Sequence, residues 1–255
     1  MATRQAWAGW AVVLAAALLA ASGCSSQAER AKELTLDLGD GVTMEFVLIP
    51  AGKFTMGEGE DQHAVTLSKP FYMGVTEVTQ AQYQAIMGTN PSRFKGETNP
   101  VETISWDDAT EFCKKLSKKT RQAVRLPTEA EWEYACRAGS KARFCFGDDA
   151  KDLGDYAWYS RNSGGTTHPV GQKKPNAWGL YDIHGNVWEW CRDYLKGVVT
   201  NPPGMPTYGV GVLRGGSWDS SADGCRAAHR STSSPGFRDS YYGCRVVVPV
   251  SALGL

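Results

Sequence analysis

The sequence lacks an excess of charge of either sign. Lysine and arginine together number 27, aspartate and glutamate also number 27, and the formal net charge is therefore zero. A domain that binds the phosphate backbone of DNA or RNA usually carries a basic surface and a positive net charge. The balanced composition gives no such electrostatic signature, so we expect no nucleic-acid partner.

The N-terminus lacks an apolar run long enough to span a membrane comfortably, which takes about 20 residues. Its apolar segment, residues 11–21, follows Arg4 and is succeeded by Ser22, Gly23 and Cys24. This order is typical of an export signal. The four residues 21–24 resemble the lipobox of bacterial lipoproteins, with alanine where leucine is usual. We predict that residues 1–23 are a lipoprotein signal peptide; an ordinary secretory signal cut nearby is the alternative.

Both interpretations place the domain outside the cytoplasm, in a bacterial cell envelope on the periplasmic or outer surface. In the first, Cys24 carries the lipid and residues 24–41 form a flexible tether to the membrane. Disulfides persist in that compartment. Beyond Cys24 there are six cysteines, whose spacing does not select a pairing: Cys113, Cys136, Cys145, Cys191, Cys225 and Cys244.

Three helices carry their own start signals. We expect them to begin after Thr79, Ser105 and Thr128, and the first and third of these caps have Gln82 and Glu131 three residues later, as in a capping box. Glycines at the far ends predict that the first and third helices stop at Gly88 and Gly139. The lysine run at the end of the second helix is interpreted as a solvated face at a helix C-terminus, where cations are favoured: Lys114, Lys115, Lys118 and Lys119.

The chain contains no internal repeat, and residues 140–245 show little regular periodicity. A strand is expected at 44–50 with a hairpin continuing over 54–57, and further short strands at 188–190, 210–214 and 244–248. The high counts of glycine, 28, and of tryptophan, 9, favour a loop-rich fold pinned by aromatic side chains. So long an irregular stretch needs disulfides, metal ions or buried aromatic residues to hold it.

An ordered series of motifs carries a family resemblance: MEFVLIPAGKFTMG at 44–57, PVETISWDDATEFC at 100–113, RLPTEAEWEYACRAG at 125–139, NAWGLYDIHGNVWEW at 176–190, LRGGSW at 213–218 and GCRVV at 243–247. The series resembles the formylglycine-generating-enzyme, or sulfatase-modifying-factor, family over residues 42–249, leaving 250–255 as a tail. The resemblance implies an asymmetric, loop-rich α+β fold related to C-type lectins, with few helices and short antiparallel strands.

The resemblance also implies a chemistry that this chain only partly matches. Enzymes of the family use O2 and a copper(I) ion held by two thiolates to oxidise a sulfatase cysteine to formylglycine; soft thiolates suit copper(I). Aligned from Trp218, the two cysteine positions fall on Ser220 and Cys225, and Ser217 matches a serine beside the catalytic site. A serine hydroxyl is a poor copper(I) ligand, so copper is not expected.

Two further site predictions come from the resemblance. Aligned backwards from residue 231, Cys225 matches a structural cysteine whose partner would be Cys136, and this disulfide is preferred over a free functional thiol. Cys113 also matches a structural cysteine of the family, with Cys244 as the candidate partner; Cys145 and Cys191 have no assigned partner. A structural calcium ion, which takes hard oxygen ligands, would be held by the carboxylates of Asp182 and Glu189 and the backbone carbonyls of Gly185 and Val187. The alternative is that both carboxylates merely accept backbone hydrogen bonds in a tight turn.

Histidine and tryptophan add no independent site. The four histidines lack a metal-binding spacing and are interpreted as structural: His63, His168, His184 and His229. Most tryptophans are expected in the core, although some could line a groove. Two functions therefore remain: an O2-dependent, formylglycine-generating-oxidase-like enzyme with a variant site, or a non-catalytic, membrane-tethered, lectin-like module that binds an exported protein, peptide or glycan. The lost cysteine favours the second.

Overall fold

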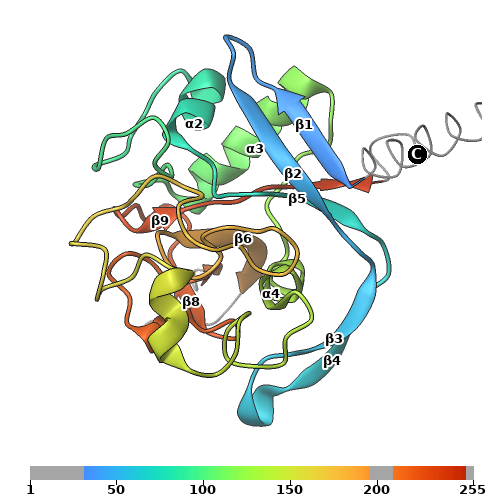
Figure 1. Cartoon of the computed structure of the whole chain (residues 1–255). Helices are drawn as coiled ribbons and strands as arrows, with labels where there is room; N and C mark the ends of the chain where they lie inside the picture. The colour runs from blue at the N-terminus through green and yellow to red at the C-terminus, as the bar shows by residue number, and fades with distance from the viewer. Residues whose placement is uncertain (1–31, 196–208, 251–255) are drawn as a thin grey trace, which may run out of the picture.

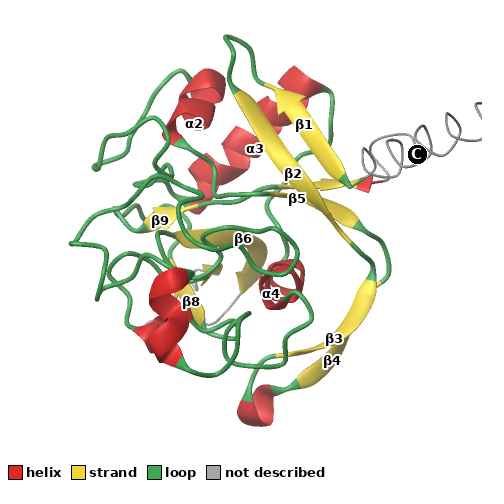
Figure 2. Cartoon of the chain, viewed as in Figure 1, coloured by secondary structure: helices red, strands yellow, loops and turns green. Residues whose placement is uncertain are grey.

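The computed structural model describes residues 32–195 and 209–250, and Figures 1 and 2 show its few helices and many loops. Three α-helices are present in these residues: α2 (Gln80–Met87), α3 (Trp106–Thr120) and α4 (Glu129–Arg137). Three short 3-10 helices cover Gly59–Asp61, Ala150–Asp155 and Ala222–Cys225. The strands are β1 (Glu33–Asp37), β2 (Thr43–Ile49), β3 (Gly52–Met56), β4 (His63–Leu67), β5 (Phe71–Gly74), β6 (Trp188–Leu195), β7 (Val210–Arg214), β8 (Arg230–Ser233), β9 (Tyr242–Gly243) and β10 (Val247–Pro249).

The strands form three small sheets. The first is antiparallel with the order β1-β2-β5-β10, which pairs the N-terminal strands with the last one. The second is the β3-β4 hairpin. The third has the order β8-β7-β6-β9, with β6 and β9 parallel and the other pairs antiparallel. Figure 1 shows α2 and α3 beside the first sheet, with α4 near the third. The predicted α+β fold of few helices and short strands is therefore confirmed.

All three predicted helix starts are confirmed by their hydrogen bonds. The Thr79, Ser105 and Thr128 side chains each accept a bond from the backbone N–H three residues on, and each helix has a complete capping box. In α3 the reciprocal partner is Asp108, which the sequence analysis did not assign. Helix α4 ends at Arg137, and its C-cap is Ala138 rather than the predicted Gly139, because Ala138 already adopts the left-handed conformation, with φ 45°.

Two predicted strands differ in length from those observed. Strand β6 extends to Leu195, because it pairs with β7 on both sides of an irregularity between Trp190 and Tyr194. The last strand, β10, is shorter than the predicted 244–248. The backbone carbonyls of Cys244 and Val246 accept hydrogen bonds from the backbone N–H groups of Val78 and Gly74, but these bonds are not part of a continuous strand ladder. Strand pairing therefore begins only at Val247.

The irregular second half is held by buried side chains. Trp132 and Trp190 are fully buried, and so are the guanidinium side chains of Arg214 and Arg245. The two arginines bond to backbone carbonyls of segments distant in sequence, for example Arg245 to Gly74. Such bonds satisfy loop carbonyls that no regular ladder satisfies. Disulfides, metal ions or buried aromatic residues were expected to hold this stretch. The structure shows buried aromatic residues, together with buried arginines that were not anticipated.

The predicted signal peptide, the lipidation position Cys24 and residues 24–31 of the predicted tether lie outside the described residues. The rest of that tether is part of the folded domain, because residues 33–37 form β1 and pair with β2. In the part of the chain that the structure does describe, none of the helices combines the length and apolarity needed to cross a bilayer.

Candidate functional site

Ser217 and Ser220 lie together in the turn that follows β7. Their hydroxyl oxygens are 3.1 Å apart, and the Ser217 backbone N–H donates to Ser220 Oγ at 2.9 Å. The Ser220 N–H in turn donates to the Ser217 carbonyl at 3.0 Å. The chain enters this turn through Gly215 and Gly216, both at positive φ, where glycine is favoured. The structure thus brings together two of the three residues that the sequence placed at the catalytic position.

Cys225 does not join the two serines as a reactive thiol. It is buried in a small apolar cluster with Phe144 and Tyr159, and this burial raises the pKa of its thiol to about 12. A Cβ atom added at Gly216 would lie 2.7 Å from Cys225 Sγ, so the sulfur packs against the backbone of that residue. A thiol in such surroundings stays protonated and is neither a nucleophile nor a ready metal ligand.

The serine pair also lacks a base. Within residues 32–195 and 209–250, no histidine, carboxylate or lysine side chain is hydrogen-bonded to either hydroxyl. A serine nucleophile requires such a partner to take its proton. The two hydroxyl groups instead stabilise the turn that they belong to. The backbone N–H of Asp219 adds to this by donating to Ser217 Oγ at 3.3 Å.

The predicted disulfide between Cys136 and Cys225 is not present, and all six cysteines of the described segments are free. The His184 ring contacts both residues: it lies 3.8 Å from Cys136 Sγ, and its Nδ1 donates to the Cys225 carbonyl at 2.7 Å. Cys113 and Cys244 share the main core cluster, also as free thiols.

His184 is a structural histidine held in one tautomer. Its Nδ1 carries the proton donated to Cys225, because Nε2 accepts the backbone N–H of Cys145 at 3.1 Å. Burial lowers the pKa of this imidazole to about 4. The ring is therefore neutral and links three cysteine-bearing segments without acting as a base or as a ligand.

The predicted calcium ligands lie in a buried acidic region, and Asp182 has a free acceptor atom there. Its Oδ2 accepts the Gly171 N–H at 2.7 Å, whereas Oδ1 is buried without a partner. Burial raises the pKa of Asp182 to about 6. Burial, with the nearby charges of Asp182 and Glu189, also raises the pKa of Glu77 well above its usual range. A buried carboxylate oxygen without a hydrogen-bond partner can serve as a ligand to a cation.

Glu189 does not fit the role of a calcium ligand. Its two oxygens accept bonds from Arg245 at 2.9–3.1 Å and from Trp132 Nε1 at 2.7 Å, so its charge is already paired. Across the described ranges, no three or more histidine, cysteine or acidic side chains are grouped to hold a metal. Any calcium in this loop would therefore depend on Asp182 and on backbone carbonyls.

A second buried charge network was missed by the sequence analysis. Arg214 pairs with Glu133 and lies 3.6 Å from Glu129, which also pairs with Arg230. Arg214 ends β7 in the motif LRGGSW, and Arg245 lies just before β10 in the motif GCRVV, where a strand was predicted. An arginine flanked by apolar residues in a strand is itself a signal of a buried partner, because an unpaired buried charge is costly.

The surface around the serine turn is aromatic. The half-buried Trp218 donates from Nε1 to the Ser240 carbonyl at 2.9 Å and meets Phe94 edge to face at 5.4 Å. Trp158 stacks on His168, with ring centroids 3.8 Å apart. Trp188 and Trp190 are core residues, as predicted, whereas Trp158, Trp178 and Trp218 remain half-buried.

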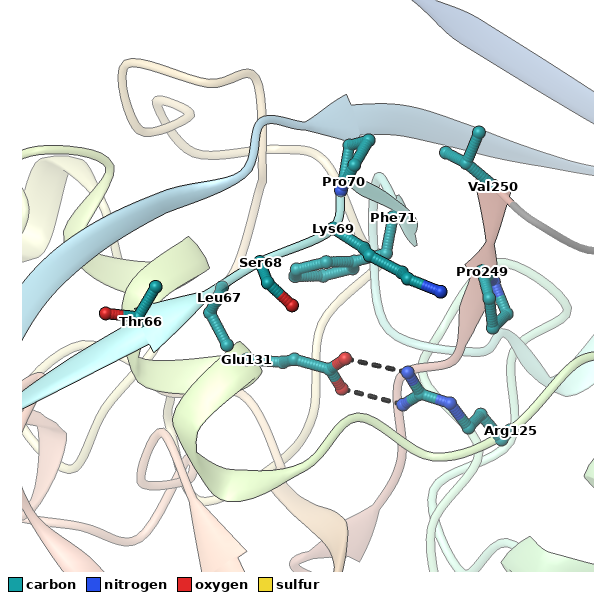
Figure 3. A pocket seen from close by; sticks show the side chains of 10 residues that line it. All are labelled: Thr66, Leu67, Ser68, Lys69, Pro70, Phe71, Arg125, Glu131, Pro249 and Val250. Carbon is teal, nitrogen blue, oxygen red and sulfur yellow. Dashed lines mark hydrogen bonds and ion pairs between the residues drawn. The ribbon is translucent and has the colours of Figure 1, made fainter. Parts of the chain in front are cut away.

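Two of the surface pockets illustrate how far the hollows lie from this turn. One of about 430 Å³ lies between the ends of β4 and β10 and contains the bidentate ion pair of Arg125 with Glu131 (Figure 3). The other, of about 420 Å³, is lined by α3, residues 124–126 and Arg192. Neither is lined by Ser217, Ser220 or Cys225, so the turn with the catalytic-position residues and these pockets are separate features.

Comparisons with known proteins agree with the motif series. Residues 39–250 match the profile of the sulfatase-modifying factor enzyme 1-like domain. The chain is 33% identical over 233 residues to "Chaperone protein LppX" of Paenibacillus barcinonensis, covering 71% of this chain and 81% of that protein. It is 38% identical over 166 residues to the formylglycine-generating enzyme of Streptomyces coelicolor, covering 56% of this chain and 51% of the enzyme. Among solved structures, Treponema denticola variable protein 1 superposes with a TM-score of 0.78 at 34% identity, covering 85% of this chain and 99% of that one.

Proposed function

The chain belongs to the sulfatase-modifying factor enzyme 1-like family, and on that premise we propose that it is an exported, membrane-tethered binding module without the family's copper-thiolate oxidation. One observation carries the proposal. Of the two positions for copper-binding thiolates, one is Ser220, and the other, Cys225, is a buried thiol in an apolar cluster. Copper(I) chemistry needs two accessible thiolates, and this chain offers neither.

A protein or peptide is favoured as the partner over a glycan. The relative LppX is named a chaperone, and this chain covers most of its length. Protein–protein interfaces are enriched in aromatic side chains relative to the rest of the protein surface. The rings of Phe94 and Trp218 beside the serine turn offer such a surface.

An assay of cysteine-peptide oxidation tests the loss of catalysis. The full chain, supplied with copper(I) and O2, is incubated with a Cys-x-Pro-x-Arg peptide, and formylglycine is followed by mass spectrometry beside an active enzyme of the family. We expect no product above the protein-free background. Turnover that disappears on Cys225→Ala would restore the oxidase interpretation, which is the alternative function.

The partner surface has its own test. Trp218→Ala and Phe94→Ala remove rings at the serine turn, whereas Tyr134→Phe leaves that turn untouched and serves as the control. Candidate exported peptides displayed on an array should lose binding to the two ring variants and keep binding to the control. Equal binding by all three proteins would place the partner surface elsewhere.

Export and lipidation at Cys24 are part of the proposal and rest on the N-terminal sequence alone. Expression in a bacterium fed labelled palmitate should label the chain, and Cys24→Ala should remove the label while leaving the protein exported. A label that survives this substitution would exclude Cys24 as the lipidated residue.

Calcium binding by the loop of Asp182 is proposed as a structural feature. Asp182 would supply a carboxylate oxygen and Gly185 and Val187 backbone carbonyls, while Glu189 remains with Arg245. Calcium chloride should raise the melting temperature of the wild type but not of Asp182→Asn, with Asp219→Asn as an exposed control. The same increase in all three proteins would exclude this site.

A further inference from the structure

The balanced net charge hides a basic and aromatic surface on one side of α3. Lys114 lines the pocket of about 420 Å³ beside this helix, and so does Arg192 from β6. Lys118 follows Lys114 by one helical turn and therefore extends the same face. Lys114 makes a solvent-exposed pair with Glu111 at 3.5 Å, whereas Lys118 and Arg192 form no ion pair with any residue of the described segments. The charges of Lys118 and Arg192 are thus not neutralised by an ion pair within these segments.

Aromatic side chains adjoin these cations. Trp106 lines the same pocket, and its ring packs against Tyr194 with the centroids 6.0 Å apart. The Trp106 backbone N–H donates to the Pro235 carbonyl at 3.0 Å, which brings the loop of Phe237 to the start of α3. Tyr194 and Phe237, exposed by 41% and 48%, are the exposed large hydrophobic residues of the described chain. Both therefore lie near the same end of the same helix.

The Trp106 ring is held in place at the floor of this surface. Its Nε1 donates to the Cys191 carbonyl at 2.8 Å, which satisfies the only polar atom of the side chain. Val124 and Leu126 complete an apolar wall opposite the helix. The remaining hollow is apolar, and cationic side chains stand at its rim: Lys114, Arg125 and Arg192. Arg125 is held by Glu131 in a largely buried pair. Lys118 and Arg192 are therefore the unpaired cations of this face, and Lys114, whose pair with Glu111 is exposed to solvent, can exchange that partner for a ligand.

We infer that this α3 face, defined as Trp106, Lys114, Lys118, Arg192, Tyr194 and Phe237, docks onto a membrane surface rich in anionic phospholipid. Lysine and arginine side chains reach lipid phosphates while their apolar stems stay on the protein, and tryptophan and tyrosine favour the level of the headgroups. Each cation near an anionic bilayer contributes about a fivefold increase in affinity, an effect that salt screens. An acidic peptide would use the cations but would leave the exposed rings and the apolar hollow in water.

This docking is distinct from the proposed lipid anchor, because it depends on lipid charge and on residues of the folded domain. The two would act together: an anchor holds the domain close to the bilayer, so that even weak contacts of the face become populated. Docking would fix which side of the domain points away from the membrane toward a partner.

The test compares full-length proteins on two kinds of vesicle. Partition is measured on vesicles of phosphatidylcholine with phosphatidylglycerol and on vesicles of phosphatidylcholine alone, and the ratio of the two affinities is reported. Residues 1–31 are common to every variant, so their contribution cancels between variants. The triple variant Lys114→Gln, Lys118→Gln, Arg192→Gln should lower this ratio on the order of 100-fold at low salt. A matched variant, Lys69→Gln, Lys141→Gln, Arg161→Gln, removes the same charge from exposed positions elsewhere and should keep it.

Two further measurements make the result specific. Phe237→Ser should weaken binding to the anionic vesicles without altering the salt dependence. Hydrogen exchange should show protection of α3 and of residues 192–195 on anionic vesicles only. Equal ratios for the two triple variants, or protection confined to other segments, would overturn the inference. So would tight binding of a polyglutamate peptide to this face without any preference for anionic vesicles.

Discussion

The carboxylate of Glu189 accepts three hydrogen bonds from the guanidinium of Arg245 at 2.9–3.1 Å, and both side chains are almost completely buried. Arg245 also donates to the carbonyls of Gly74, Val75 and Tyr181. One arginine therefore joins the first sheet, the loop before Asp182 and the third sheet. A buried pair with this many satisfied atoms specifies how the segments assemble.

Replacing Arg245 by methionine should strongly destabilise the protein. The substitution leaves Glu189 buried without a cation near Glu77 and Asp182, and breaking such a pair costs about 3–5 kcal/mol. Chemical denaturation should show this loss for Arg245→Met. The double variant Glu189→Gln, Arg245→Met should recover part of it, because no unpaired Glu189 charge remains. Equal stability of the single and the double variant would contradict the pairing.

The cysteines should be unreactive in the native protein. Burial raises the pKa of the Cys225 thiol to about 12, so at pH 8 roughly one thiol in 10,000 is ionised. Iodoacetamide labelling followed by peptide mass spectrometry should modify Cys145 first, because it is only half-buried. All six should react after denaturation. Rapid native labelling of Cys225 would indicate a reactive thiolate, and a Cys136–Cys225 bridge in a non-reduced digest would contradict the free thiols.

Restoring a cysteine at position 220 should not restore a copper site. Ser220→Cys supplies an accessible thiol beside Ser217, but Cys225 still lies in the cluster of Phe144 and Tyr159. Titration with copper(I) against a competing chelator should therefore give the weak affinity of a single thiolate. Tight binding of one ion by this variant, lost again on Cys225→Ala, would show that Cys225 can turn toward position 220.

His184 should make stability fall in acid. Its pKa is lowered from 6.5 to about 4 in the fold by burial, so below pH 6.5 the unfolded chain binds a proton that the folded chain does not. Stability should be unaffected by this group above pH 6.5 and should decline toward pH 4, by about 3 kcal/mol at 1.36 kcal/mol per pKa unit. Unfolding free energies measured in a chelating buffer should decline less steeply for His184→Gln. Parallel curves for the two proteins would contradict a neutral, buried ring.

The sequence by itself determined the features that depend on neighbours along the chain. A cap and its partner three residues later meet whenever the helix forms, so Thr79 with Gln82 and Thr128 with Glu131 could be assigned without a structure. The motif series likewise determined the family and, with it, the loop-rich fold. The same motif alignment also showed that Ser220 stands at the first of the two copper-binding cysteine positions.

Tertiary structure alone decided which distant groups meet. Glu189 and Arg245 are 56 residues apart, and Glu133 and Arg214 are 81 apart. Neither pairing follows from a local spacing, because it depends on how the intervening loops close. The same holds for Cys225, which the sequence offered both as a catalytic thiol and as a disulfide partner. Its sulfur lies instead in an apolar cluster, since burial among Phe144, Leu153 and Tyr159 is a property of the packed fold and not of the motif.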